Sequence, residues 1–172
     1  MKKLILFFTA ITFVSTAQIF EPVKWDFSQK KLEENEIELS FKATIDDGWY
    51  IYSQDAGDGP VSTEFTFFDP SPDRYGVDKN WVQEQVPIEE FDPNFDAVLK
   101  YYKHEAVFNV KIHVLSTEDF TLKGEVYYMT CDSTQCLPPE ALEFSFDIEG
   151  VDESLIDKSF IEESKSSEGT ST

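Results

Sequence analysis

The sequence has few positive charges and few metal-binding side chains. It contains 14 lysines and arginines against 34 aspartates and glutamates, a formal net charge of −20 at pH 7. Such a surface repels nucleic acid and anionic membranes, so we expect no nucleic-acid partner. The simplest interpretation of the charge is that it keeps the protein in solution.

Histidine and methionine are too scarce to favour a metal site. An ordinary structural zinc site takes four ligands at tighter cysteine spacing, and the only histidines are His104 and His113. Thiolates favour Cu(I), but Met129 is the only methionine after Met1, so no methionine cluster supports copper handling. We expect neither a metal nor a cofactor.

Long hydrophobic runs are missing after the N-terminus. Lys2 and Lys3 precede an apolar stretch at 4–14 and Ser-Thr-Ala at 15–17, a pattern typical of a cleaved export signal. No later segment approaches the ~20 apolar residues of a membrane helix. We predict a signal peptide at 1–17 and a soluble mature chain that does not span a membrane. Losing two lysines takes its formal charge from −20 to −22. Its location would be periplasmic or otherwise exported.

Helical patterns and internal repeats are scarce too, whereas alternation of apolar and polar residues is frequent. Alternation means strands with one buried face. The candidate strands are residues 23–27, 37–45, 49–52, 63–68, 81–86, 108–114, 122–128 and 142–148. They predict an antiparallel β-sandwich, with a turn at 46–48 joining two of them into a hairpin. We predict one domain at 18–150, then a short amphipathic segment and a disordered polar tail at 151–172.

Two long connections separate the predicted strands, at residues 54–62 and 87–103. The second contains four aromatic residues, Phe91, Phe95, Tyr101 and Tyr102. A solvated loop has no need of four rings, so this segment either covers a site or closes one end of the sandwich. The pattern does not decide between these two interpretations.

The two cysteines, Cys131 and Cys136, have four residues between them and precede Leu137-Pro138-Pro139. Cross-linking so short a loop removes about 2 kcal/mol of chain entropy, against about 4.7 kcal/mol for a loop of ~100 residues. Stability alone is therefore a weak reason for the pair. A structural staple in an exported β-domain is one interpretation, and reversible dithiol chemistry is the one we favour.

The surroundings of the cysteines in the sequence are acidic. Between Gly124 and Asp157 there are nine acidic residues and no lysine, arginine or histidine. Thiolates need nearby positive charge, so we predict weakly activated thiols and a partner that brings the nucleophile.

Three stretches together cover most of residues 21–149 and carry a resemblance. They are Asp-Gly-Trp-Tyr-Ile-Tyr-Ser at 47–53, Asp-Pro-Asn-Phe at 92–95 with the strand at 106–114, and residues 127–140 with both cysteines and the diproline. They resemble the N-terminal periplasmic domain of the DsbD family of thiol:disulfide interchange proteins. The cysteine hairpin with its diproline is the most specific of the three. The resemblance implies an all-β, immunoglobulin-like sandwich with a redox hairpin and an aromatic cap loop.

The resemblance also implies roles for five residues. Cys131 and Cys136 would be the catalytic redox pair, with Cys136 forming the mixed disulfide, Phe95 the cap, and Tyr50 and Tyr52 the pocket aromatics. The best-known member of the family has five residues between its cysteines instead of four, so the turn must differ here.

The partners that the resemblance implies are a thioredoxin-like electron donor or acceptor, exported disulfide proteins and a membrane electron transporter. This sequence has neither a membrane span nor a thioredoxin-like motif, so we expect a separate donor. The protein would be one component of a protein-disulfide reductase. The alternative is a noncatalytic Ig-like binding module with a structural disulfide.

Overall fold

The computed structural model describes residues 21–68, 73–92 and 95–156. Within these ranges it is nearly all β, and it has one short 3₁₀ helix, η1 (Glu153–Leu155). The strands are β1 (Val23–Lys31), β2 (Glu36–Ile45), β3 (Tyr50–Tyr52), β4 (Glu64–Phe68), β5 (Tyr75–Val77), β6 (Val82–Gln83), β7 (Ile88–Asp92), β8 (Ala97–Tyr102), β9 (Glu105–Val114), β10 (Phe120–Tyr128), β11 (Thr130–Cys131) and β12 (Glu140–Ile148). The predicted signal peptide and polar tail lie outside the described residues.

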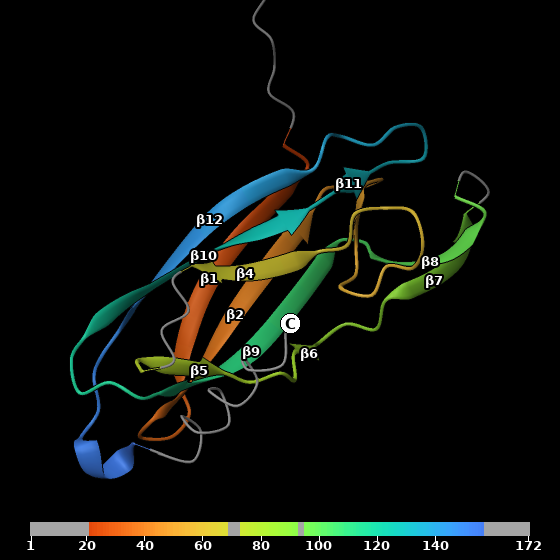
Figure 1. Cartoon of the computed structure of the whole chain (residues 1–172). Coiled ribbons are helices and arrows are strands. Elements are labelled where there is room, and N and C mark those ends of the chain that lie inside the picture. Colours follow the sequence, from red (N-terminus) through yellow and green to blue (C-terminus); the bar gives the residue numbers. More distant parts are fainter. Residues whose placement is uncertain (1–20, 69–72, 93–94, 157–172) are drawn as a thin grey trace, which may run out of the picture.

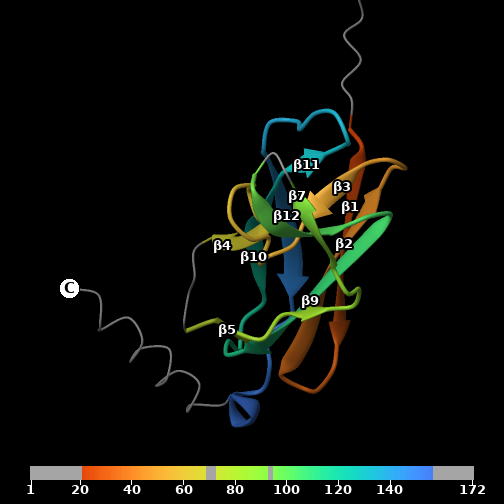
Figure 2. The same ribbon diagram turned by 90° about the vertical axis from the view of Figure 1, so that its right-hand side faces the viewer.

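Two antiparallel sheets face each other, as predicted. One has the strand order β1-β2-β9-β5, with β6 also paired to β9, and the other has the order β12-β10-β4. Figures 1 and 2 show the two layers from the front and from the side. The alternation at 37–45 is confirmed in β2, where Leu39, Phe41 and Ala43 are fully buried. Each sheet thus turns one apolar face towards the other sheet, and the side chains of these two inner faces form the core.

The space between the two sheets is filled mainly by aromatic rings. Phe41 of β2 lies at the centre of this core, with ring centroids 4.7 Å from Phe65 and 4.8 Å from Phe144. Phe65 also stacks on Trp81 at 4.5 Å. These rings come from both layers, so their contacts bury a large apolar area between the sheets and stabilise the packing of one sheet on the other.

The predicted hairpin at residues 46–48 is wrong. The turn itself forms, because Trp49 N donates to Asp46 O at 3.1 Å and Gly48 has a φ of +87°. However, β2 already pairs with β1 on one side and β9 on the other, so it has no free edge for β3. The chain therefore passes after the turn into a third sheet, with the strand order β11-β3-β8-β7, at one end of the sandwich.

The long connection predicted at 87–103 is also wrong, because this segment is the β7–β8 hairpin. Its strands pair from Ile88 opposite Tyr101 to Asp92 opposite Ala97. The hairpin projects beside the sandwich (Figures 1 and 2). Alternation is missing because residues 88–91 of β7 are all exposed, while β8 buries side chains on both of its faces. Neither β7 nor β8 therefore shows the alternation of apolar and polar residues by which strands are recognised in a sequence.

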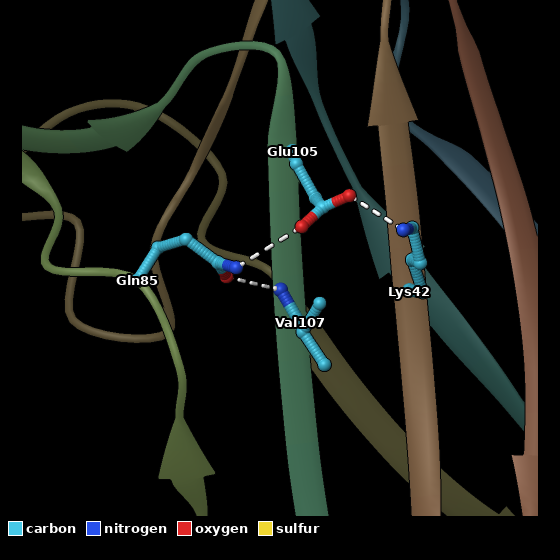
Figure 3. Close-up of polar contacts among 4 residues, drawn as sticks. All are labelled: Lys42, Gln85, Glu105 and Val107. Carbon is cyan, nitrogen blue, oxygen red and sulfur yellow. Dashed lines mark hydrogen bonds and ion pairs between the residues drawn. The ribbon is translucent and has the colours of Figure 1, made fainter.

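The base of this hairpin is attached to the sandwich by side-chain hydrogen bonds (Figure 3). Gln85 accepts a hydrogen bond from Val107 N at 2.7 Å and donates to Glu105 at 3.3 Å. Glu105 in turn forms an ion pair of 2.5 Å with Lys42 of β2. The Gln85 side chain thus accepts the hydrogen bond from Val107 N after β6 has ended. This contact holds the chain beside β9 just before β7 begins.

The predicted amphipathic segment after residue 150 is only partly described. Its start is η1, whose N-cap Asp152 accepts a hydrogen bond from Ser154 N at 3.0 Å. Such a cap satisfies one of the free backbone N–H groups at the beginning of a helix.

Candidate functional site

One face of the end sheet collects the residues that the sequence singled out. Cys131 of β11 lies opposite Tyr50 of β3, and Tyr52 lies opposite Tyr101 of β8. Paired residues in an antiparallel ladder, and residues two apart along a strand, project to the same side. Cys131 and the three tyrosines therefore share one face, on which Leu99 is also buried.

The opposite face of the same sheet belongs to the sandwich core. Ile51 and Tyr102 are paired with each other between the tyrosines and are buried in the main aromatic cluster. The end sheet is thus anchored by one face and presents the other to the cysteines.

The two cysteines form a disulfide with an S–S distance of 2.00 Å. They face each other across a tight hairpin, in which Leu137 N donates to Thr130 O at 2.9 Å. Cys131 is 0% exposed, whereas Cys136 is exposed to solvent. The two halves of one disulfide therefore differ in access, and a second protein can reach only the Cys136 side directly.

Asp132 organises the turn between the cysteines. Its carboxylate accepts hydrogen bonds from Thr134 N at 2.6 Å, Thr134 Oγ1 at 2.7 Å and Gln135 N at 2.8 Å. These bonds, those of Thr134 above all, lower the pKa of Asp132 from its usual value. The carboxylate stays ionised and fixed beside the pair, so its negative charge opposes thiolate formation there.

Tyr52 places a hydroxyl group on the buried sulfur. Its O–H donates to Cys131 Sγ at 3.5 Å, within the range of a hydrogen bond to sulfur. Burial raises the pKa of Tyr52 well above its ordinary value. The phenol therefore remains protonated, and remains a donor, throughout the neutral range.

Tyr50 joins the cysteine loop to the tyrosine cluster. Its O–H donates to Asp132 O at 3.3 Å, and its ring lies 4.8 Å from that of Tyr101 and 5.6 Å from that of Tyr52. Burial raises the pKa of Tyr50, with smaller contributions from surrounding charges that include Asp92. Both tyrosines named from the sequence are thus brought next to the cysteines.

Phe95 is half-buried and packs against the small cluster that contains Cys131. Its ring lies directly over Gly59, whose φ is +124° and where an added Cβ would collide with the ring. The predicted cap residue therefore lies at the edge of the cluster to which the buried cysteine belongs. Residues 93 and 94, which precede it in the matching stretch, lie outside the described part of the chain.

The sequence did not predict a groove of about 250 Å³ that adjoins the cysteine loop. Its lining comprises Tyr50, Tyr52, Glu90, Phe91, Asp92, Leu99, Tyr101, Lys103 and Ser133. Tyr101 donates to Glu90 at 2.5 Å, and Lys103 Nζ lies 5.3 Å from the centre of the Tyr101 ring. The spacing of Leu99 and Tyr101 could have indicated this face, had the segment been recognised as a strand.

The remaining candidates lie elsewhere. His104 pairs with Asp47 at 3.3 Å on the surface, and His113 of β9 lies 3.6 Å from Glu36. Within the described ranges, no three acidic, histidine or cysteine side chains gather so that they could hold a metal ion. In the same ranges, no helix has the length and apolar character required to cross a bilayer.

A β-sandwich that carries a half-exposed disulfide on an end hairpin, beside a tyrosine cluster, defines a candidate redox domain. The family described as "Thiol:disulfide interchange protein DsbD, N-terminal" matches residues 16–148. The chain therefore belongs to this family, which takes part in thiol:disulfide electron transfer with thioredoxin-like partners. The resemblance read from the sequence is confirmed, as is the immunoglobulin-like sandwich.

Solved structures similar to this chain include the N-terminal periplasmic domain of ScsB from Proteus mirabilis. The TM-score is 0.53 and the identity 16%, over 88% of this chain and 55% of that one. The chain thus spans little more than half of the ScsB structure, and the likeness concerns the fold.

Two further similar structures come from Neisseria meningitidis. The reduced DsbD N-terminal domain is 22% identical over 73% of this chain and 86% of that one, with a TM-score of 0.42. The complex of the DsbD and PilB N-terminal domains gives 18% identity, 79% and 93% coverage, and a TM-score of 0.48. A search of curated proteins finds no match.

Proposed function

We propose that this protein is a dithiol/disulfide electron carrier and one component of a protein-disulfide reductase. Cys131 and Cys136 exchange their bond with a separate thioredoxin-like partner and with exported substrate proteins. The observation that carries the proposal is the unequal exposure of the two cysteines within one disulfide. A bond kept only for stability needs no accessible sulfur, whereas exchange requires in-line access to one of the two.

In the oxidised protein, a partner thiolate attacks Cys136 Sγ. A bond forms between the partner's sulfur and Cys136, the Cys131–Cys136 bond breaks, and the electron pair goes to Cys131 Sγ. Tyr52 donates its hydrogen bond to the sulfur that becomes the anion, at 3.5 Å in the oxidised state. A hydrogen bond to the charged form favours it, so Cys131 is the better leaving group.

The second thiol of the partner then completes the reduction. It attacks the partner's own sulfur in the mixed disulfide and releases Cys136 as a thiolate, and both cysteines take protons from solvent. Two electrons have passed to this protein, and the partner has become a disulfide. In the reverse direction Cys136 attacks a substrate disulfide and Cys131 resolves the intermediate.

The face around the disulfide fits a carrier that relies on its partner for the nucleophile. Asp132 is fixed in the cysteine turn by three hydrogen bonds, and Glu90 lies across the neighbouring groove. Negative charge raises the pKa of a nearby thiol, so the exposed Cys136, which would act as the nucleophile, is not activated by these carboxylates. Phe95 acts as a cap on the Cys131 side of the bond, where it packs against the buried cluster, and a fitting partner displaces it.

Family membership supports a thioredoxin-like partner and an exported location for this chain. The family is named for thiol:disulfide interchange, and the similar ScsB domain is described as periplasmic. Disulfides also persist mainly in oxidising compartments such as the periplasm. We propose that the electron donor is a separate polypeptide and that a membrane electron transporter supplies this donor with electrons.

The test is trapping of covalent partners in the exporting cell with two matched variants. Cys131→Ser leaves the exposed Cys136 as a single thiol, and Cys136→Ser leaves the buried Cys131. We expect mixed disulfides with thioredoxin-like or exported disulfide proteins on Cys131→Ser and almost none on Cys136→Ser. Equal trapping on both variants, or none on either, would contradict the proposal.

Equilibration in glutathione buffers tests the noncatalytic alternative. A carrier should be reduced at potentials in the range of exchange proteins, whereas a structural disulfide lies below about −300 mV. A potential in the latter range would leave an Ig-like binding module as the better description.

A further inference from the structure

The groove beside the cysteine loop combines aromatic faces with carboxylates. The rings of Tyr50, Tyr52 and Tyr101 come from β3 and β8, and Glu90 and Asp92 come from the neighbouring β7. Glu90 lies opposite Leu99 and Asp92 opposite Ala97 in the β7–β8 ladder. The sheet register therefore places both carboxylates on the face that carries the tyrosines.

The groove is next to the disulfide. Ser133 of the cysteine turn forms part of its wall, and Tyr52 both lines the groove and contacts Cys131 Sγ. A side chain within the groove would therefore belong to the same polypeptide segment that brings a sulfur to Cys136.

The charges around the groove are mostly negative. Glu90 and Asp92 line it, and Asp132 belongs to the adjoining turn; all three contribute to the raised pKa of Tyr50, after the larger effect of burial. Lys103 is the cation among the lining residues, and its Nζ lies 5.3 Å from the centre of the Tyr101 ring. Lys103 thus shows that a ring of this groove accepts a cation at its face.

We propose that this groove binds an arginine or lysine side chain that flanks the reactive cysteine of the redox partner. The inference rests on the proposed function and adds the kind of partner sequence that the site selects. Tyrosine faces attract cations through the ring quadrupole, and carboxylates at the rim complement the charge. A volume of about 250 Å³ admits one long side chain and excludes a folded element.

Two activated peptides test the proposal with the Cys131→Ser protein. Each carries one cysteine as a mixed disulfide with thionitrobenzoate, and the next residue is arginine in one peptide and citrulline in the other. Cys136 attacks the peptide sulfur and forms the protein–peptide disulfide. The thionitrobenzoate thiolate leaves with the electron pair and is measured by its colour, and the cysteine proton goes to the buffer. Citrulline keeps the shape of arginine without its charge.

We expect the arginine peptide to react about five- to tenfold faster than the citrulline peptide, with the difference shrinking as salt is added. The double change Glu90→Gln and Asp92→Asn should remove most of this advantage, which is measured as the ratio of the two rates so that a change in the reactivity of Cys136 itself cancels. The matched control is the double change Glu125→Gln and Glu143→Gln, at two paired acids on the outer face of β10 and β12. It changes the net charge by the same amount and should have little effect on the arginine advantage.

Lys103→Gln provides a variant with the opposite effect. Removing the resident cation should increase the arginine advantage about two- to threefold, because the incoming side chain no longer meets a like charge. A damaged fold would not produce such a gain. Loss of the arginine advantage in this variant would overturn the proposal.

The same preference is measurable on the unmodified oxidised protein, in case Cys131→Ser does not fold. Dithiol Cys-Gly-Pro-Cys peptides flanked by arginine or citrulline each supply two electrons and become cyclic disulfides. Equal rates for the two peptides would overturn the groove proposal alone. So would an arginine advantage that falls as much in the Glu125→Gln/Glu143→Gln variant as in the Glu90→Gln/Asp92→Asn variant. Failure of Cys136 to react with any peptide overturns the proposed function instead.

Discussion

Two buried clusters in the described part of the chain use aromatic residues differently. The core between the large sheets is built mainly from phenylalanine, tryptophan and aliphatic side chains. The small cluster at the end sheet consists of Tyr52, Ala56, Leu99, Tyr101 and Cys131, with Tyr50, Phe95, Ala97 and Met129 packed against it. Its hydroxyl groups reach a sulfur, a carboxylate and a backbone carbonyl.

The difference teaches what a tyrosine adds to a buried ring. Phe41 and its neighbours only remove apolar area from water, which stabilises the sandwich. Tyr52 buries as much ring and also delivers a donor to Cys131 Sγ inside a low-dielectric environment. We therefore expect changes in the core to affect stability and changes in the small cluster to affect exchange.

The largest effect should come from Phe41→Ala in the core. Deleting a fully buried phenylalanine lowers the free energy of unfolding by about 3–5 kcal/mol. Denaturant titration measures this loss, and Phe91→Ala, whose ring is 57% exposed, should stay within about 0.5 kcal/mol. Similar losses for the two variants would contradict the distinction between core and surface rings.

Phe95→Ala should accelerate reduction of the disulfide by dithiothreitol about tenfold, because access limits the exchange rate. Gly59→Ala should act in the same direction, since its Cβ would displace the Phe95 ring. Gly48→Ala is the matched control: it also introduces a side chain at positive φ, but into open space. If Phe95→Ala unfolds the protein instead, Phe95 is a core ring and not a cap.

Tyr52→Phe removes one hydrogen bond of about 1 kcal/mol from the leaving sulfur, so exchange should slow about fivefold. The same substitution should raise the pKa of the Cys131 thiol, which thiolate absorbance measures in the Cys136→Ser protein. Tyr102→Phe loses a hydroxyl bonded to Gln83 on the other face of the sheet and should change neither quantity. An equal effect of both substitutions would mean that Tyr52 acts through packing.

The smallest effect concerns alkaline pH. Burial, with help from the hydrogen bond to Glu90, raises the pKa of Tyr101 to about 12 from a model-peptide value of 10.0. The unfolded chain releases this proton first, so the stabilising effect is fully present below pH 10 and is lost as the pH rises from 10 towards 12. Urea midpoints at pH 9 and 11 should differ less in Tyr101→Phe than in the wild type. An unchanged difference would contradict this contribution.

The sandwich could be predicted because its strands bury one face each. Leu39, Phe41 and Ala43 alternate with polar residues, and the same period recurs in β10, in β12 and in the later part of β9, from Val110 to Val114. The β7–β8 hairpin could not, since Leu99, Tyr101 and Tyr102 fill both faces of one strand. Nor does sequence show that β2 lacks a free edge, which is why the turn at Gly48 leads to another sheet.

At the candidate site, residue types could be predicted but their surroundings could not. The family motifs indicated Cys131, Cys136, Tyr50, Tyr52 and Phe95, and the structure brings them to one end of the molecule. Their catalytic and capping roles stay predictions. The unequal burial of the cysteines and the groove depend on β7 and β8 lying beside β3, a long-range pairing that no local pattern encodes.

Burial of Cys131 also has a kinetic consequence for the proposed carrier. With a single reachable sulfur, the electron source and the electron recipient must compete for the same atom and cannot be attached together. Turnover then alternates between two half-reactions, which gives ping-pong kinetics with parallel lines in a double-reciprocal plot. An excess of either partner would slow the cycle by occupying Cys136 when the other is due.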